Sequence, residues 1–327
     1  MTVKQRQQGL VSTIIPVYNR PSLVVEAVMS VLAQTYRPIE VIVVDDGSTD
    51  DTLSVLQSLE KTHAELIVLT QDNAGPGVAR EQGRQKAQGE FIQYLDSDDL
   101  LFKDKFQLQV AALHADAEAA AAYGKTEATL FDEPLLGVAM RQTGVKTQSM
   151  FPDFLRSRWW GTSTPLYRAA VLDKVGPWLS LINEEDWEYD CRIASCGGKL
   201  AYVDEFVSHA RHHDSNDHLS NGGTTDPAKL KHRCLAQQKI YQHAQAYTLL
   251  DTTGDQITVD DWAYYSKSVF LLARQCAAAK LPKQASEMFK LSVEANGGAT
   301  IQHRFFRGLV IFVGWYNASR IVNWLGK

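Results

Sequence analysis

Residues 90–99 read EFIQYLDSDD: a largely apolar run, Glu90–Leu95, that leads directly into the acidic cluster Asp96-Ser97-Asp98-Asp99. Such a short run of aromatic and aliphatic residues is typical of a strand that is buried in a parallel sheet. The acidic residues therefore stand where that strand ends, and this is where an α/β sheet presents polar groups to a ligand.

The same layout occurs twice earlier in the chain, at Val11–Pro16 before Tyr18-Asn19-Arg20 and at Glu40–Val44 before Asp45-Asp46. The stretches between and after these runs predict further helices and one further strand. The expected helices are Ser22–Gln34, Thr52–Lys61 and Gly75–Ala87, and the expected strand is Glu65–Thr70. This alternation predicts an α/β fold with a doubly wound, mostly parallel sheet and helices on both faces. We expect the three polar strand ends to converge on one edge of that sheet.

The composition limits the class of protein. The 327 residues contain 33 Lys and Arg against 38 Asp and Glu, a formal net charge of −5, which argues against nucleic acid as a partner. The four cysteines form no C-x-x-C pair, so we interpret them as reduced thiols. No stretch approaches the roughly 20 apolar residues of a membrane span, and the first residues do not resemble a signal peptide. We therefore expect a cytoplasmic protein.

The acidic cluster is the first candidate for chemistry, because neither a P-loop nor a G-x-G-x-x-G motif is present. Asp96 and Asp98 offer oxygen ligands that suit Mg²⁺ or Mn²⁺, and such an ion would neutralise a bound diphosphate. An equally plausible interpretation from these residues alone is that the aspartates cap a helix that begins near Leu100.

Several motifs in this order resemble the family 2 inverting glycosyltransferases of GT-A fold. They are Pro16-Val17-Tyr18-Asn19-Arg20, Val43-Val44-Asp45-Asp46-Gly47-Ser48, Asn73-x-Gly75 with Ala79-Arg80, Gly89–Asp99, Val175-Gly176-Pro177-Trp178, Glu185-Asp186-Trp187-Glu188 and Arg211-His212-His213. The resemblance covers roughly residues 11–215, and the four N-terminal motifs are specific in combination. One departure is Glu81, where Asn is more usual, and we expect it to change helix packing or a local hydrogen bond.

The resemblance implies a role for individual residues in holding a nucleotide-sugar donor. Pro16, Val17 and Tyr18 would line the nucleoside pocket, and Asp46 would accept a hydrogen bond from the base, typically uracil. Arg80 would lie near the diphosphate, where a guanidinium group suits phosphate oxygens. Asp96 and Asp98 match the D-x-D motif, with Asp98 the direct ligand of a divalent metal, Mn²⁺ or Mg²⁺. His213 would add a metal or diphosphate contact.

Asp186 matches the catalytic base of the family. Inversion requires a single displacement, in which the acceptor hydroxyl attacks the anomeric carbon and loses its proton to a positioned base. The alternative is that Glu184, Glu185 and Asp186 only cap a helix, predicted at Asp186–Cys196. Glu185, Trp159 and Trp160 are candidates for the acceptor side, and core packing is the alternative for the two tryptophans.

The domain organisation follows from a change of pattern near residue 226. We expect a GT-A catalytic domain at 1–226, with the donor side at about 11–103 and the acceptor side at about 104–226, and a helical domain at 227–327. Within the acceptor side we predict a helix at Lys103–Ala122, a strand at Leu200–Val203 and an active-site loop or lid within Asp204–Thr225. The helices expected afterwards are Lys229–Tyr247, Val259–Ala279 and Pro282–Glu294.

The C-terminal tail is basic, with seven basic and two acidic residues in 280–327, and it contains the apolar run Gly308–Tyr316. Two interpretations stay open. Residues 300–327 form a peripheral, interfacial helix on the inner face of the cytoplasmic membrane, or the helix packs on the catalytic domain or on a second subunit of a homo-oligomer.

These observations favour transfer of a single sugar from a nucleotide sugar, most simply a UDP-sugar, to a glycan or lipid-linked acceptor in cell-envelope polysaccharide synthesis. Neither a Gln-x-x-Arg-Trp motif after Asp186 nor a membrane span is present, and both mark processive synthases. The alternatives are a sugar-nucleotide pyrophosphorylase, which would need a Gly-rich basic loop in place of Pro16–Arg20, and a non-catalytic nucleotide-sugar-binding module.

Overall fold

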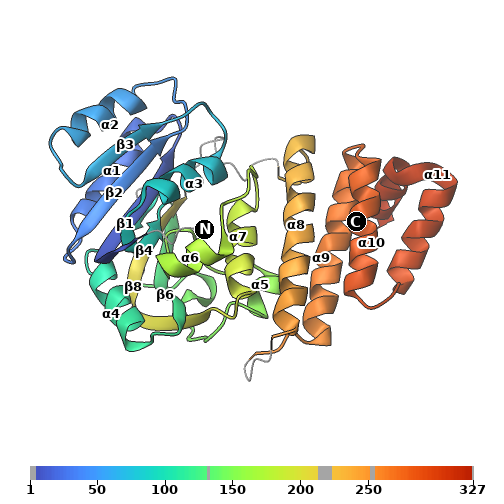
Figure 1. Ribbon diagram of the computed structural model, residues 1–327. Coiled ribbons are helices and arrows are strands. Elements are labelled where there is room, and N and C mark those ends of the chain that lie inside the picture. Colours follow the sequence, from blue (N-terminus) through green and yellow to red (C-terminus); the bar gives the residue numbers. More distant parts are fainter. Residues whose placement is uncertain (1–4, 131–132, 213–222, 251–254, 326–327) are drawn as a thin grey trace. The chain divides into compact units, whose positions relative to one another are not determined.

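The computed structural model describes residues 5–130, 133–212, 223–250 and 255–325 (Figure 1). Its contacts divide the chain into two compact units. The sheet unit comprises residues 1–150, 159–180 and 196–214, and the helical unit comprises residues 151–158, 181–195 and 215–327.

The sheet unit confirms the predicted fold class, an α/β fold with a mostly parallel sheet. Its strands are β1 Gln7–Val17, β2 Ile39–Asp45, β3 Leu66–Thr70, β4 Gly89–Tyr94, β5 Leu100–Leu101, β6 Ala119–Leu130, β7 Leu166–Arg168 and β8 Lys199–His212. Its helices are α1 Pro21–Leu32, α2 Thr52–Glu60, α3 Pro76–Lys86, α4 Lys105–Ala115 and α6 Ala169–Val175, with a 3₁₀ turn, η1, at Arg141–Gly144. The eight strands lie in the order β3-β2-β1-β4-β7-β6-β8-β5.

Strand direction follows from the connections. The pairs β1–β2, β2–β3, β1–β4 and β6–β8 are parallel, whereas β7 runs antiparallel between β4 and β6, and β5 runs antiparallel to β8. Each crossover between the first four strands contains a helix, as parallel neighbours require. The carboxyl ends of β1, β2 and β4 therefore point to the same edge of the sheet.

The core explains why the first strands and helices form where the sequence predicts them. Strand β2 and the part of β1 from Leu10 onward are buried on both faces, so they are mostly apolar rather than alternating, and they also bury the polar side chains of Ser12, Thr13 and Glu40. Helix α1 begins at Pro21, which fits the first helical turn, and buries a stripe at helical spacing. That stripe consists of Val24, Ala27, Val28 and Val31.

Two predicted elements were wrong. The helix expected at Lys103–Ala122 ends at Ala115 in α4, and Ala119 already begins β6. Residues 119–122 are all alanine, a strong helix former, but they are buried in β6, where residues of this run pair with β7 and β8. Sheet pairing thus outweighs local helix propensity.

The loop expected at Asp204–Thr225 was also wrong in its first part. Strand β8 continues through residues 204–212 and pairs with β6 up to Leu130↔His212. Residues 213–222, the centre of the proposed lid, lie outside the described residues. A polar strand of this kind carries no continuous apolar run, so its sequence resembles a loop.

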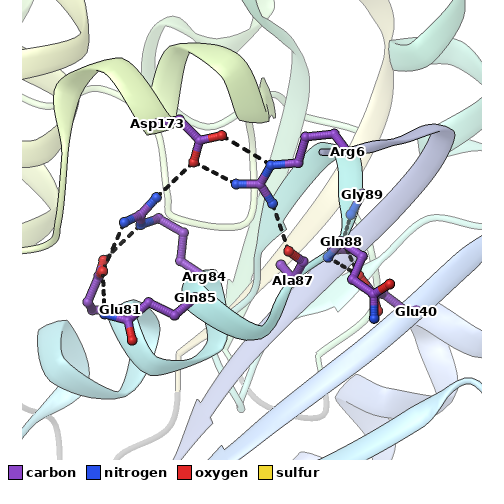
Figure 2. Close-up of polar contacts among 10 residues, drawn as sticks. Arg6, Glu40, Glu81, Arg84, Gln85, Ala87, Gln88, Gly89 and Asp173 are labelled. Carbon is purple, nitrogen blue, oxygen red and sulfur yellow. Dashed lines mark hydrogen bonds and ion pairs between the residues drawn. The ribbon is translucent and has the colours of Figure 1, made fainter. Parts of the chain in front are cut away.

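A polar network fixes α3 on the sheet unit (Figure 2). Asp173 of α6 accepts from Arg6 Nη2 at 2.6 Å and from Arg84 Nη1 at 3.0 Å, and Arg6 Nη1 also donates to Ala87 O at 2.7 Å. Arg84 in turn donates to both carboxylate oxygens of Glu81, at 2.8 and 2.9 Å. Helix α3 is thereby held at one end, which matters because it also carries Arg80.

The helical unit contains α5 Asp153–Arg156, α7 Glu185–Ala194, α8 Pro227–Thr248, α9 Val259–Ala278, α10 Pro282–Ala295 and α11 Ile301–Leu325. The helices predicted in 229–247, 259–279 and 282–294 are confirmed within two residues at each end. Gly314, at φ 76° and ψ 167°, interrupts α11. Among the residues that the structure describes, no helix is both long and apolar enough to span a membrane.

The contacts place the domain boundary differently from the sequence expectation at residue 226. Helix α7 groups with the helical unit, because its acidic residues pair with α8. Glu184 accepts from Arg233 Nε at 2.6 Å and from Gln237 Nε2 at 2.7 Å, and Glu188 lies 2.9 Å from His243 Nε2. These partners are about 50 residues apart in sequence, so chain order alone could not place the boundary.

Candidate active site

Three strand ends of the sheet unit converge, as the sequence predicts. After β1, the side chain of Asn19 accepts from Thr49 N at 2.8 Å, and its main-chain N–H donates to Ser48 Oγ at 2.9 Å. These contacts tie the end of β1 to the loop after β2. Arg20 Nη1 donates to Asp98 Oδ2 at 2.7 Å, which ties the end of β1 to the loop after β4. The polar residues thus form one site, at the carboxyl edge of β1, β2 and β4.

The residues at the end of β1 differ in what they can offer a ligand. Tyr18 is 44% exposed, so its ring is available for stacking with an aromatic base. Pro16 is buried in β1, and Val17 is buried in the apolar core. Val17 can therefore contribute main-chain atoms to a bound ligand, but its side chain cannot.

Asp46 organises the turn between β3 and α3. Its Oδ1 accepts from Gln71 Nε2 at 2.7 Å and from Ala74 N at 2.8 Å, and its Oδ2 accepts from Gly75 N at 2.8 Å. A carboxylate oxygen can accept two hydrogen bonds, so Oδ2 retains capacity for a further donor such as a base N–H. Asp46 thus shapes the wall of the site as well as being a candidate for base recognition.

The neighbouring Asp45 is a feature that the sequence analysis did not single out. Its Oδ2 accepts weakly from Ser48 N, at 3.3 Å, whereas its Oδ1 is buried and has no hydrogen-bond partner among the described residues. A buried carboxylate oxygen without a donor is costly, so this atom is a candidate acceptor for a hydrogen bond from a ligand. The signal was present in the sequence, as the first of two consecutive aspartates at a strand end.

Arg80, in α3, is held by a carboxylate and by an aromatic ring. Its Nη2 donates to Asp96 Oδ1 at 2.8 Å, and its guanidinium carbon lies 5.0 Å from the ring centroid of Trp178. The main-chain N–H of Trp178 donates to Glu81 Oε2 at 3.2 Å. Glu81 therefore makes a local hydrogen bond with Trp178 and connects the network of Figure 2 to the ring that packs on Arg80.

The environment of Glu81 favours its charged form. Burial raises the pKa of this carboxyl, but hydrogen bonds from Arg84 and Gln85, the charge of Arg84 and the Trp178 N–H together outweigh burial and lower it overall. A charged Glu81 is the acceptor that all of these donors require.

The acidic cluster does not cap a helix. Residues Leu100–Leu101 after it form β5, and α4 begins only at Lys105. Asp99 is buried, where its Oδ1 accepts from Arg211 N at 3.1 Å and its Oδ2 from Ser163 Oγ at 2.9 Å. Burial, followed by the charges of Asp98 and Asp96, raises the pKa of Asp99 well above its usual value. Asp99 thus anchors the cluster, and Asp96 and Asp98 remain as the candidate ligands.

Asp96 and Asp98 fit a small divalent cation. Such an ion is commonly held by one or two carboxylates, with phosphate and water oxygens as the remaining ligands. In this structure both carboxylates pair with arginines, Asp96 with Arg80 and Asp98 with Arg20, so cationic groups already balance their charge. The described residues contain no cluster of three or more His, Cys, Asp or Glu side chains that could hold a metal. Among the described residues, the candidate ligands are therefore this carboxylate pair.

Of the histidines near the end of β8, His209 lies among the described residues, whereas His213, the predicted additional ligand, lies outside them. His209 Nε2 lies 2.7 Å from Thr129 Oγ1, and burial, then the charge of Arg211, lower the pKa of this imidazole. Arg211 donates from Nε to Asp98 O at 2.6 Å and pairs with Glu26. Arg20 and Arg211 are thus two basic residues of the site, and their contacts with Asp98 were not predicted from the sequence.

Asp186 belongs to the helical unit, in the first turn of α7. Its Oδ2 accepts from Arg158 Nη1 at 2.7 Å, and its Oδ1 accepts from Trp187 N at 2.8 Å. Arg158 also donates from Nε to the buried Asp190 at 2.7 Å. Glu184, the residue before α7, makes no side-chain cap and turns to α8 instead. Asp186 does accept from a main-chain N–H of the first turn, so helix capping remains an alternative to the catalytic role.

The proposed acceptor residues are mostly buried. Trp159 and Trp160 are buried in the sheet unit, with ring centroids 4.9 Å from each other and 5.2 and 5.8 Å from Tyr123. In this structure they form core packing, the alternative that the sequence left open. Glu185 is buried at the start of α7.

Residues 12–169 match the protein-family model "Glycosyl transferase family 2". An uncharacterized glycosyltransferase of Nostoc, alr2836, is 31% identical over 238 residues, which are 68% of this chain and 70% of that protein. The putative teichuronic acid biosynthesis glycosyltransferase TuaG of Bacillus subtilis is 42% identical over 102 residues, 31% of this chain and 40% of TuaG. An uncharacterized glycosyltransferase of Rickettsia felis is 47% identical over 100 residues, but the match covers only 16% of that protein.

Solved structures agree with the fold. TarS of S. aureus, residues 1–349 in complex with UDP-GlcNAc, superposes with a TM-score of 0.60 at 19% identity, over 87% of this chain and 86% of that one. The mannosyltransferase PcManGT of Pyrobaculum calidifontis, in complex with GDP-Man and Mn²⁺, gives a TM-score of 0.50 at 17% identity, over 97% and 87% of the two chains. At these identities the likeness shows a shared GT-A fold.

Proposed function

Because the chain belongs to glycosyl transferase family 2, we propose that it transfers a single sugar from a nucleotide diphosphate sugar to an acceptor hydroxyl, with inversion at the anomeric carbon. The observation that carries this proposal is the convergence of Tyr18, Asp46, Arg80, Asp96 and Asp98. They bring an exposed aromatic ring, a base acceptor, a guanidinium group and two carboxylates to the carboxyl edge of three parallel strands.

Each of these residues has a role in holding the donor. Tyr18 stacks on the base, and Asp46 accepts the base N–H; uracil is the base we favour, because TarS was solved with UDP-GlcNAc. Pro16 and Val17 contribute the wall beneath the nucleoside. Arg80, backed by Trp178, contacts the diphosphate oxygens when it leaves Asp96.

Asp98 and Asp96 would hold a divalent cation, Mn²⁺ or Mg²⁺, with His213 as a further candidate ligand. Bound there, the ion would supply charge neutralisation for the diphosphate leaving group. Arg20 is the group that balances Asp98 before the donor arrives, because its Nη1 lies 2.7 Å from Asp98 Oδ2.

The chemical step is a single displacement. The acceptor oxygen bonds to the anomeric carbon from the face opposite the nucleotide, while the bond from that carbon to the β-phosphate oxygen breaks and the nucleoside diphosphate departs. Asp186 takes the proton of the hydroxyl. Arg158 orients this carboxylate, since its Nη1 donates to Asp186 Oδ2.

The acceptor is a hydroxyl of a glycan or a lipid-linked glycan. We place the reaction in cell-envelope polysaccharide synthesis, in the cytoplasm or at the inner face of the cytoplasmic membrane, because TuaG is a teichuronic acid biosynthesis glycosyltransferase. Glu185, Trp159 and Trp160 would act on this side only as supports, in view of their burial.

Calorimetric titration with UDP and GDP, with and without Mn²⁺, tests the donor site, and hydrolysis of nucleotide sugars tests the chemistry. Asp98→Asn should abolish the dependence of binding on metal, and Tyr18→Ala should weaken binding about 10-fold through lost stacking. Asp186→Asn should bind the donor normally and lose at least about 100-fold in turnover. Glu118→Gln, at a surface ion pair with Lys199, is the matched control. A chain that binds neither nucleotide in the presence of Mn²⁺ would refute the proposal.

A further inference from the structure

Helix α11 presents a row of exposed apolar side chains. Ile301, Phe305 and Phe312 follow one another at spacings of four and seven residues, with Gly308 between them, so they lie on one face of the helix. All three side chains are exposed, and Phe312 reaches 87%. At a rise of 1.5 Å per residue, this apolar row is about 16 Å long. The opposite face is the one that packs, because Phe306 is buried against Phe270 and Ala318.

A basic cavity lies beside the apolar row. It has a volume of about 300 Å³ between α10 and α11, and three cations, Lys290, Arg304 and Arg307, line it. None of the three side chains has a hydrogen-bond or ion-pair partner among the residues that the structure describes. Glu294 is the acidic residue of the lining, and it is engaged by the hydroxyl of Tyr241. With three cations and one carboxylate in its lining, the cavity offers an excess of positive charge to a ligand.

All charged residues of the C-terminal segment, residues 299–327, are basic. Residues 299–327 contain no Asp or Glu, and their basic residues are Arg304, Arg307, Arg320 and Lys327. Arg304 and Arg307 share a helical row with the exposed Ile311, next to the row of Phe305 and Phe312. Cations and apolar side chains thus alternate over the same surface rather than forming separate patches.

This combination restricts what can cover the surface. A purely apolar partner would bury Arg304 and Arg307 without counter-charges, which costs more than the apolar contact returns. A small soluble anion would fill the cavity but leave Phe312 in water. A ligand that carries a phosphate next to a hydrocarbon chain satisfies both features.

We propose that α10 and α11 form a binding site for anionic phospholipid at a membrane surface, with the head-group phosphate in the Lys290–Arg304–Arg307 cavity and acyl chains along Phe305 and Phe312. A cavity of 300 Å³ accommodates a head group and excludes the chains, which therefore remain in the bilayer beside the helix. The segment lies in the interface and does not span the membrane. The site is independent of the proposed sugar transfer, because it involves none of the donor-binding residues.

Co-flotation of the full chain with vesicles tests the site. The protein should float with mixed phosphatidylcholine–phosphatidylglycerol vesicles, should bind vesicles of phosphatidylcholine alone far less, and should dissociate as the salt concentration rises. Arg304→Gln/Arg307→Gln should weaken binding roughly 25-fold, at about fivefold for each basic residue near an anionic surface. Phe312→Ser should weaken it at least about 10-fold through lost apolar insertion.

Two matched variants control for charge and exposure. Lys61→Gln/Lys86→Gln removes two exposed cations from α2–β3 and α3 of the sheet unit, and Leu249→Ser changes a side chain that is 86% exposed. Both should bind vesicles as the unmodified chain does, and circular dichroism should show that all variants are folded.

Four outcomes would overturn the proposal. The first is no flotation with either vesicle, and the second is equal loss in the α11 variants and the controls. The third is that inorganic phosphate binds at the cavity, is lost in Arg304→Gln/Arg307→Gln, and is accompanied by no vesicle binding, which would assign the cavity to a soluble anion. A concentration-dependent dimer that dissociates in Phe312→Ser, again without vesicle binding, would assign the apolar row to a second copy of the chain.

Discussion

The support of Arg80 by Glu81 leads to a sharp prediction for Glu81→Gln. Four donors face the two oxygens of this carboxylate: Arg84 Nη2 and Gln85 Nε2 point to Oε1, and Arg84 Nε and Trp178 N point to Oε2. Glutamine has one oxygen and one NH₂ group in the same positions. Whichever way the amide is oriented, two of the four donors must then face an NH₂ group.

The magnitude follows from these contacts. The Glu81 side chain is 14% exposed, so water replaces the lost acceptor only in part. Hydrogen bonds to a charged group contribute about 1.5–3 kcal/mol each when they are buried, and partial exposure reduces this value. We expect Glu81→Gln to lower the free energy of unfolding by about 2 kcal/mol at pH 7. Because Trp178 loses its anchor below Arg80, we also expect weaker binding of the donor nucleotide.

The pH dependence distinguishes this mechanism from a packing defect. The pKa of Glu81 is lowered in the folded chain, so its contribution is fully present above the ordinary value of 4.5 and is lost as pH falls through the folded value. The difference in stability between the unmodified chain and Glu81→Gln should therefore be constant near neutral pH and should shrink below pH 4.5.

Urea denaturation at a series of pH values measures this difference, and Glu118→Gln is the control. Glu118 also pairs with a cation, Lys199, but its side chain is 72% exposed, and its replacement should change stability by less than about 1 kcal/mol at any pH. A stability difference for Glu81→Gln that stays unchanged down to low pH would show that the carboxylate charge is not its source. Equal stability at pH 7 would refute the proposed support of Arg80 altogether.

Three further substitutions test other parts of the chain. Arg158→Met removes the cation that pairs with the buried Asp190, and urea denaturation should show a loss of about 3 kcal/mol in the free energy of unfolding. Adding Asp190→Asn should recover part of this loss. If it recovers nothing, the unpaired charge of Asp190 is not the cause. Gly83→Ala should lower the free energy of unfolding by about 1–3 kcal/mol, because a Cβ there would lie 2.4 Å from Ile14 Cγ2. An unchanged melting temperature would show that Ile14 in β1 can shift to make room for the added methyl group. Gly308→Ala, where no atom lies within 4 Å of the added Cβ, should instead stabilise α11 by up to about 1 kcal/mol, and a destabilised chain would mean that this face is covered.

The candidate site was predictable in outline because its signals are local. Each of the clusters at Tyr18, Asp46 and Asp98 directly follows an apolar run, and a parallel sheet brings the ends of such runs to one edge. The family resemblance of the same residues adds their proposed roles. The helices after residue 226 were predicted for the same reason, since the spacing of their apolar residues is a property of consecutive sequence.

The sequence by itself therefore determined the fold class, the family and the edge of the sheet where the candidate ligands lie. Only the tertiary structure decided that the alanines of β6 form a strand, that Arg20 pairs with Asp98, and that α7 belongs with α8 through Glu184 and Arg233. The physical reason is range. The periodicity of helices and strands repeats over a few neighbouring residues, so it can be read from consecutive sequence. In the cases named here, strand pairing and ion pairs join residues up to 80 positions apart, and whether such residues meet depends on how the whole chain packs.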